Sequence, residues 1–192
     1  MLRPLLLSSA IAFALVACGD RSAESTMPAT ESTTAAPAQN PLFTASTLPF
    51  QAPPFDKLKD ADYQPAIEEG MRQHLAEIRE IADNPEPPTF ENTIEAMERS
   101  GELLTRSANV FFMLTGANTN ETLQAVEEAL APKLAEHSSA IYLDPALFAR
   151  VKTIYDQRAT LGLTPEQVTV VEHTHDNFVR AGALLDEAGK AE

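Results

Sequence analysis

Hydrophobic residues recur at three- and four-residue steps along most of the chain beyond residue 60, which is the spacing of amphipathic α-helices. No run alternates apolar and polar residues over the length of a β-strand. The pattern therefore predicts an all-α fold of antiparallel helices joined by short loops. The first predicted helix places its apolar seam at Tyr63, Ile67, Met71, Leu75, Ile78 and Ala82.

The segment "NPEPPTF" ends this first helix, and Thr89 is a suitable N-cap for a second one. The second helix is expected to run to "TGANTN", where Gly116 suits the C-terminal turn. Its small residues Gly101 and Ala108 would let a neighbouring helix approach closely. The complete seam consists of Phe90, Ile94, Met97, Gly101, Leu104, Ala108 and Phe111.

Three more helices are predicted downstream. The third covers residues 121–141, and Pro132 should kink or divide it. Asp144-Pro145 is the cap and first position of the fourth, which carries Leu161 inward. Thr164-Pro165-Glu166-Gln167, a variant of the capping box, starts the fifth. The seam of the fifth helix consists of Val168, Val171, His175, Phe178, Gly182 and Leu185.

The N-terminal residues have the features of a lipoprotein signal. An apolar run from Leu5 to Val16 follows Arg3; it is too short to span a bilayer and fits a secretory signal. It leads into Leu15-Val16-Ala17-Cys18, a lipobox pattern, so we predict a signal peptide over residues 1–17 and lipid attachment at Cys18. The lipid would hold the chain in the cell envelope, facing the periplasm, and Gly19 favours the outer membrane. The alternative is an ordinary secretory signal with Cys18 incidental.

Composition divides the remainder. Residues 18–40, rich in Ser, Thr, Ala and Pro, are expected to form a disordered tether. Residues 41–61 combine proline with Phe43, Phe50 and Phe55, which predicts an extended arm that packs on another surface. The helical domain is expected over residues 62–192. The net charge of −14 argues against nucleic acid as a partner and leaves the lipid as the means of membrane attachment.

The stretch "VEHTHDNF" invites a metal-site hypothesis, because His173 and His175 lie beside Glu172 and Asp176. His175 falls on the apolar seam, and His173 lies about 200° around the helix from it. Ligands on opposite faces cannot close on one tetrahedral ion, and the pair His173 and Asp176 lacks a third ligand. We interpret His175 as a core-facing imidazole that needs one hydrogen-bond partner, and His173 as a solvated one.

Other catalytic motifs are missing from the sequence. None of the four histidines is followed by Glu, so the chain has no His-Glu-x-x-His zinc helix. A Gly-rich phosphate loop and a Gly-x-Ser-x-Gly elbow are also missing. As the only cysteine, Cys18 leaves no disulfide framework and no cysteine zinc cage. We assign no catalytic, cofactor-binding or metal-binding residue to this chain.

The loops carry a family resemblance. The phrases "STLPFQAPPFDKLKDADYQPAIEEGM", "NPEPPTFENTIEAMERSGELL", "FFMLTGANTNETLQ" and "FVRAGALL" together resemble the N-terminal region of bacterial peptidyl-dipeptidases, zinc metallopeptidases of the thimet-oligopeptidase type. The resemblance covers about residues 40–185. It implies a large helical enzyme with a channel for short peptides, in which zinc held by two histidines and a glutamate activates water. The family's zinc helix lies far downstream of the region that resembles this chain.

The resemblance implies a non-catalytic N-terminal portion that helps to cover the channel and is inactive alone. Zinc and short peptides would belong to the intact enzyme, and a separately encoded catalytic fragment is another possible partner. The end at "DEAGKAE" resembles the middle of the family's helical pattern, which predicts a truncated chain. The alternative is a membrane-tethered helical module that binds a partner without enzymatic activity.

Overall fold

The computed structural model describes residues 39–186 and residue 189, and the regular elements among them are all helical. The all-α prediction is therefore confirmed. The predicted signal peptide, Cys18 and nearly all of the predicted tether lie outside these residues. No helix in the described part is long and apolar enough to cross a membrane. The elements are η1 (Pro41–Phe43), η2 (Pro49–Gln51), α1 (Asp60–Ala82), η3 (Phe90–Glu95), α2 (Ala96–Arg99), α3 (Glu102–Ala117), α4 (Glu121–Tyr142), α5 (Pro145–Gln157) and α6 (Pro165–Ala181).

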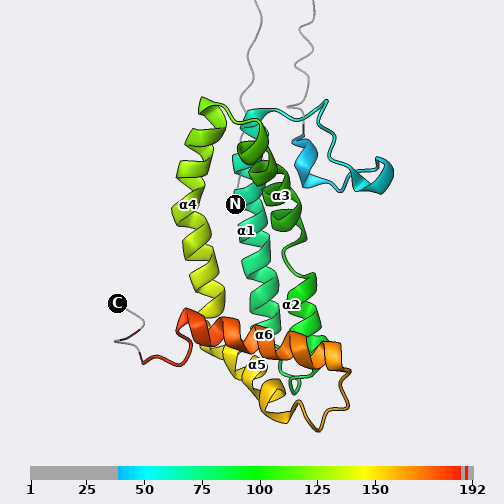
Figure 1. The fold of residues 1–192 in the computed structure, drawn as a ribbon, viewed down its shortest axis with the longest axis vertical. Helices are drawn as coiled ribbons and strands as arrows, with labels where there is room; N and C mark the ends of the chain where they lie inside the picture. Colours follow the sequence, from blue (N-terminus) through cyan, green and yellow to red (C-terminus); the bar gives the residue numbers. More distant parts are fainter. Residues whose placement is uncertain (1–38, 187–188, 190–192) are drawn as a thin grey trace, which may run out of the picture. The chain divides into compact units, whose positions relative to one another are not determined.

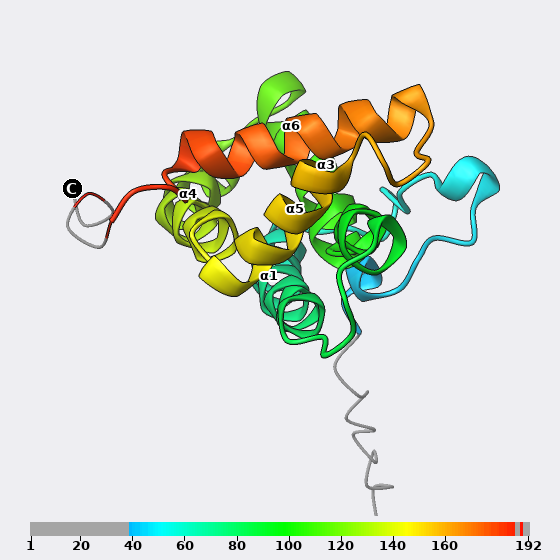
Figure 2. The same ribbon diagram turned by 90° about the horizontal axis from the view of Figure 1, so that it is seen from below.

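The helices from Ala38 onward form one compact unit around α1. In Figure 1, α4, α1 and α3 lie side by side, and α5 and α6 lie across one end of them. α1 runs antiparallel to α3, as predicted, but parallel to α4, with Asp60 beside Asn120 and His74 beside His137. Figure 2, seen from that end, shows α5 beside α6. Because α1 contacts both α3 and α4, it forms the centre of the helical layer.

Two clusters of buried apolar side chains hold this arrangement together. One cluster joins η1, α1, α3 and α4, with Phe111 and Leu130 fully buried. The other joins one end of α1 and α4 to η3, α5 and α6, with Ile94, Leu147 and Phe178 fully buried. Burying a large aliphatic or aromatic side chain contributes about 1.5–3 kcal/mol each, so these seams account for the docking of α6 across the layer.

The predicted helix starts are confirmed by their caps. The side chains of Thr89, Asp144 and Thr164 each accept a hydrogen bond from the backbone N–H three residues further on. Local hydrogen bonds of this kind depend only on neighbouring residues, which is why the sequence reveals them. Pro132, in contrast, does not divide the third predicted helix, since α4 runs through it as one helix.

The second predicted helix is interrupted, so the prediction of one continuous helix is wrong. It is split into the short η3–α2 segment and α3 at Ser100 and Gly101, where Gly101 has a left-handed φ of 71°. A Cβ at Gly101 would lie 2.9 Å from the ring of His74. Gly101 is therefore needed for a turn beside an imidazole, and not for contact between straight helices. Gly116 lies within α3, which ends at Ala117.

Several residues expected on inward seams are exposed instead. Leu75, Leu161 and Leu185 have exposed fractions of 36%, 41% and 52%. Leu161 and Leu185 lie beyond the ends of α5 and α6, where helical periodicity no longer applies. Gly182 is the left-handed C-cap of α6, with φ of 102°. Leu75 lies on a part of α1 that other described elements do not cover.

The segment before α1 is anchored to the helices by its first residues. Leu42 is buried, its carbonyl oxygen accepts a hydrogen bond from Arg106, and Asn40 donates to the carbonyl oxygen of Asp62. The phenylalanines expected to pack are exposed, and Phe50, with a φ of 58°, is fully so. An aliphatic side chain, and not the aromatic rings, therefore attaches this segment.

Candidate functional site

Two histidines that are far apart in the sequence meet between α1 and α4. His74 Nδ1 lies 3.0 Å from His137 Nε2, and the ring centroids are 5.0 Å apart. His74 Nε2 lies 3.0 Å from the Oγ atom of Ser100, at the break between α2 and α3. The cluster thus joins three helical segments, and Gly101 leaves the space that the ring of His74 occupies.

One arrangement of protons satisfies every hydrogen bond of this cluster. The Ser100 hydroxyl donates to the carbonyl oxygen of Met97, 2.7 Å away, so its oxygen accepts from His74 Nε2–H. His74 Nδ1 is then an acceptor, and His137 Nε2–H donates to it. Both imidazoles are neutral in this chain of bonds.

Burial favours the same neutral state. The pKa of His74 is lowered by burial, although the nearby Glu77 carboxylate acts in the opposite direction. The pKa of His137 is lowered by burial and then by the proximity of His74. His137 is 8% exposed, and its Nδ1 atom is buried without a hydrogen-bond partner among the described residues. A proton on this atom would therefore be poorly stabilised.

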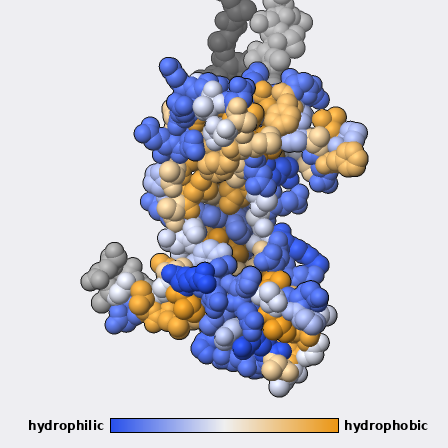
Figure 3. Space-filling view, in the orientation of Figure 1, coloured by the Kyte–Doolittle hydropathy of each residue, from blue (hydrophilic) through white to orange (hydrophobic). Residues whose placement is uncertain are grey.

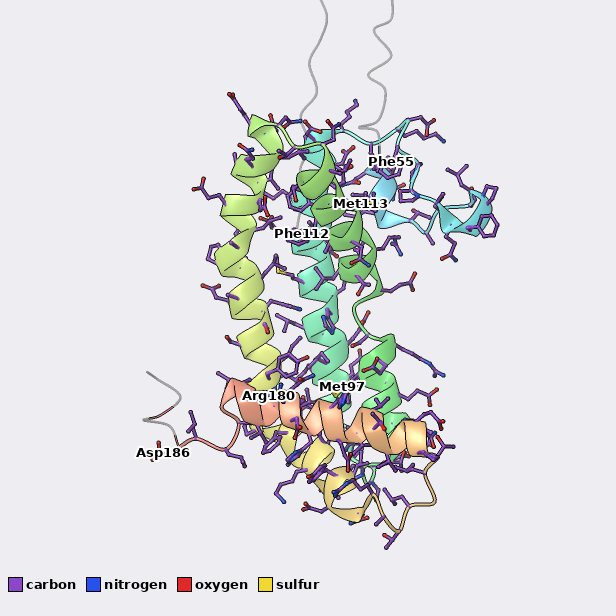
Figure 4. All side chains as sticks on the ribbon, in the orientation of Figure 1. Phe55, Met97, Phe112, Met113, Arg180 and Asp186 are labelled. Carbon is purple, nitrogen blue, oxygen red and sulfur yellow. The ribbon has the colours of Figure 1, made fainter. Side chains whose placement is uncertain are left out.

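A pocket of about 260 Å³ lies beside the histidine pair and is lined by residues of α1, α2, α3, α4 and α6. Its wall is mostly apolar, and Figure 4 labels one of its residues, Met97, on α2. Besides the histidines, its polar side chains are those of Glu98, Ser138, Thr174 and Asn177. The pocket therefore combines an apolar wall with two neutral imidazoles and one carboxylate.

The pair does not have the arrangement of a serine nucleophile and its base. A base must accept the hydroxyl proton of the serine before the serine oxygen can attack. In the arrangement of protons assigned above, the Ser100 hydroxyl donates to the carbonyl oxygen of Met97, and His74 donates to the serine oxygen. The geometry is that of a polar joint between helices, with an imidazole at the edge of a pocket.

The two histidines of "VEHTHDNF" have the orientations predicted from the apolar seam of α6, with His175 facing inward and His173 facing outward. His173 is exposed, whereas the ring of His175 is stacked on Tyr155, with centroids 3.8 Å apart. The hydrogen-bond partner expected for His175 is not found, because its Nδ1 atom is buried without one among the described residues. Asp176 Oδ1 is 3.9 Å away, beyond hydrogen-bond distance. Stacking on an aromatic ring, and not a hydrogen bond, holds this imidazole.

Within residues 39–186 and 189, no group of three or more His, Cys, Asp or Glu side chains is placed to hold a metal ion. The pairing of His74 with His137 was not predicted from the sequence. The sequence did place both histidines on inward faces of their helices. His74 is four residues before the buried Ile78, and His137 is four residues before the buried Ile141. A histidine on each of two seams is consistent with a contact, although only the packing shows that the two helices are neighbours.

The histidine pair predicts a pH-dependent stability. Both folded-state pKa values are lowered, so below the unfolded value of about 6.5 the unfolded chain binds protons that the folded chain does not. The free energy of unfolding should therefore fall as the pH is lowered from 7.5 to 5. Denaturant titrations across this range measure it, with the double variant His74→Gln/His137→Gln as the control. If the free energy of unfolding changed equally with pH in both proteins, the histidine pair would not be the cause of the pH dependence.

Comparisons with known proteins give close sequence relatives but no matching family model. Over 152 residues, the chain is 49% identical to a dipeptidyl carboxypeptidase of Salmonella typhimurium (strain LT2) and 50% identical to one of Escherichia coli (strain K12). These residues are 79% of this chain and 22% of each relative, so the chain spans less than a quarter of the curated relatives it matches. Oligopeptidase A of Escherichia coli is 23% identical over 146 residues, which are 76% of this chain and 21% of that protein. The resemblance to the peptidyl-dipeptidases is therefore confirmed.

Proposed function

We propose that this chain, whose sequence matches part of the dipeptidyl carboxypeptidases, is a non-catalytic helical part of such an enzyme. The complete enzyme would release C-terminal dipeptides from short peptides, and the helices described above would help to cover its peptide channel. The observation that carries the proposal is the identity of 49–50% over 152 residues to relatives with that name.

The roles of the distinctive loop residues support a structural function. In the "PPTFENTI" segment, the side chains of Asn92 and Thr93 accept hydrogen bonds from the buried Arg150. In the "LTGANTN" segment, Asn120 caps α4 and donates to the carboxylate of Asp60. Residues that looked specific to the family are thus used to fix loops against helices.

The described residues do not fit a zinc site, because they offer no group of three or more candidate ligand side chains. We therefore derive no step of zinc chemistry from this chain. In the proposal, residues outside the matched part would hold the zinc, and its chemistry would be the activation of a water molecule.

An activity assay tests this proposal. The complete reading frame that contains this sequence and the 192-residue chain would be purified separately and incubated with N-blocked tetrapeptides. We expect the complete protein to release C-terminal dipeptides, to lose the activity on chelation and to regain it with zinc. The 192-residue chain should release none. Dipeptide release by the 192-residue chain, or none by the complete protein, would refute the proposal, and the second result would favour a tethered binding module.

We also propose that lipid on Cys18 attaches the protein to a membrane of the cell envelope, on its periplasmic side. The lipobox sequence Leu15-Val16-Ala17-Cys18 supports this, as does the absence of any other cysteine. In cells fed an alkyne-labelled fatty acid, the native chain should carry the label and sediment with membranes. The Cys18→Ser variant should lose the label, and a variant that kept it would contradict the proposal.

A further inference from the structure

The outward surface of α3 is unusually apolar for a helix in contact with water. Phe112 and Met113 have exposed fractions of 40% and 53% on this helix, and Phe55 of the preceding segment is 48% exposed. Figure 3 shows orange residues gathered over α1 and α3, in the area where Figure 4 labels these three side chains. We call Phe55, Phe112 and Met113 the α3 face.

This face is not a by-product of the packing of α3 on α1. The side of α3 that meets the core carries the buried residues Leu103, Ser107, Val110 and Phe111. Phe112 packs edge-on against the buried Phe111, with ring centroids 5.2 Å apart, but both Phe112 and Met113 keep large exposed fractions outside the core.

Charge is also missing from this part of the chain. Residues 107–120, "SANVFFMLTGANTN", contain no Asp, Glu, Lys or Arg, although such residues make up 22% of the protein. Interface centres are depleted of charged residues and enriched in aromatic residues and methionine, whereas free helix surfaces are charged. An exposed apolar patch with these features marks a site of protein contact.

The length of the relatives indicates what covers the face. The matched residues are only 22% of each dipeptidyl carboxypeptidase, so most of such a polypeptide lies outside the part described here. A segment in the same polypeptide is present at high effective concentration and needs no separate association step. The rest of the same polypeptide is therefore the simplest candidate to cover the α3 face.

From these observations we propose that the α3 face packs against the remaining part of the same peptidase polypeptide, through an apolar and uncharged surface on that part. This inference rests on the function proposed above and adds the surface by which this piece joins the enzyme. Phe112 and Met113 are its central contacts, because aromatic and methionine side chains contribute most of the energy at interface centres.

Thiol labelling tests the inference without relying on enzymatic activity. Met113→Cys would be introduced into the complete reading frame and into the 192-residue chain, both with Cys18→Ser, and reacted with a maleimide. The rate at residue 113 would be measured by mass spectrometry of the peptide that contains it. In the complete protein, we expect the native rate to be at least tenfold lower than the rate in denaturant. In the 192-residue chain, the two rates should be within about threefold, as expected for a half-exposed side chain.

The labelling rates distinguish the inference from its alternatives. Equal native and denatured rates in the complete protein would overturn the inference, as would protection that appears only at high protein concentration, which would indicate a second copy. If the complete protein releases dipeptides while residue 113 stays reactive, only the inference fails. If residue 113 is protected but no dipeptide is released, only the proposed function fails.

Discussion

Replacing Arg150 with methionine is expected to lower the free energy of unfolding by about 3 kcal/mol or more. Arg150 is 7% exposed and donates hydrogen bonds to the carbonyl oxygens of Asn84 and Glu86, at 2.8 and 3.0 Å. It also donates to Asn92 Oδ1 at 2.9 Å and Thr93 Oγ1 at 3.2 Å. One guanidinium thus holds the whole loop between α1 and η3.

The loss of stability is large because methionine fills the space of the arginine side chain but cannot donate a hydrogen bond. The carbonyl oxygens of Asn84 and Glu86 and the side chains of Asn92 and Thr93 would then lose their charged donor, and a hydrogen bond to a charged group contributes about 1.5–3 kcal/mol. Burial lowers the pKa of the Arg150 guanidinium. No carboxylate among the described residues pairs with it, so the oxygen atoms that accept its hydrogen bonds stabilise its charge.

Urea denaturation measures the effect, and Arg72→Met is the matched control. Arg72 is also on a helix, but its side chain is 68% exposed and pairs only with Glu69. Its replacement should change stability by less than about 0.5 kcal/mol. Arg150→Lys, which keeps the charge and loses the planar fork, should still be clearly destabilised. A lysine variant as stable as the native chain would show that the charge alone matters.

Gly70→Ala should destabilise the protein by about 3 kcal/mol, at the upper end of the range for an overpacked core. A Cβ built on Gly70 lies 2.7 Å from both the Cα and the backbone nitrogen of Leu104. Backbone atoms cannot rotate away as a side chain can, so α1 and α3 would have to separate. Their separation would loosen the core around Phe111 and Val110.

The control for this prediction is Gly116→Ala on α3. Nothing lies within 4 Å of a Cβ at Gly116, and the residue is exposed inside the helix. Alanine should therefore raise stability by about 0.5–1 kcal/mol, through its better helix propensity. Thermal or urea unfolding of the two variants gives opposite signs if the packing is as described. A neutral Gly70→Ala would mean that the two helices are less closely packed.

The local features of the fold could be predicted from the sequence. The three helix caps depend on residues three positions apart, and helical periodicity predicts the inward seam of α1, apart from Leu75, and the inward orientation of His175. The same reasoning extended the seams too far, to Leu161 and Leu185, because periodicity carries no information on where a helix stops. It also placed the small-residue contact at Gly101, although Gly70 is the residue where the two backbones meet.

The sequence by itself determined that the chain is helical, where most helices begin, and which family its loops resemble. Only the tertiary structure decided that α3 breaks from α2 beside His74, that His74 meets His137, and that Arg150 holds the loop before η3. It also decided that Phe112 and Met113 remain outside the core. These features join residues up to 66 positions apart, and such distances are set by how helices pack, which no local pattern encodes.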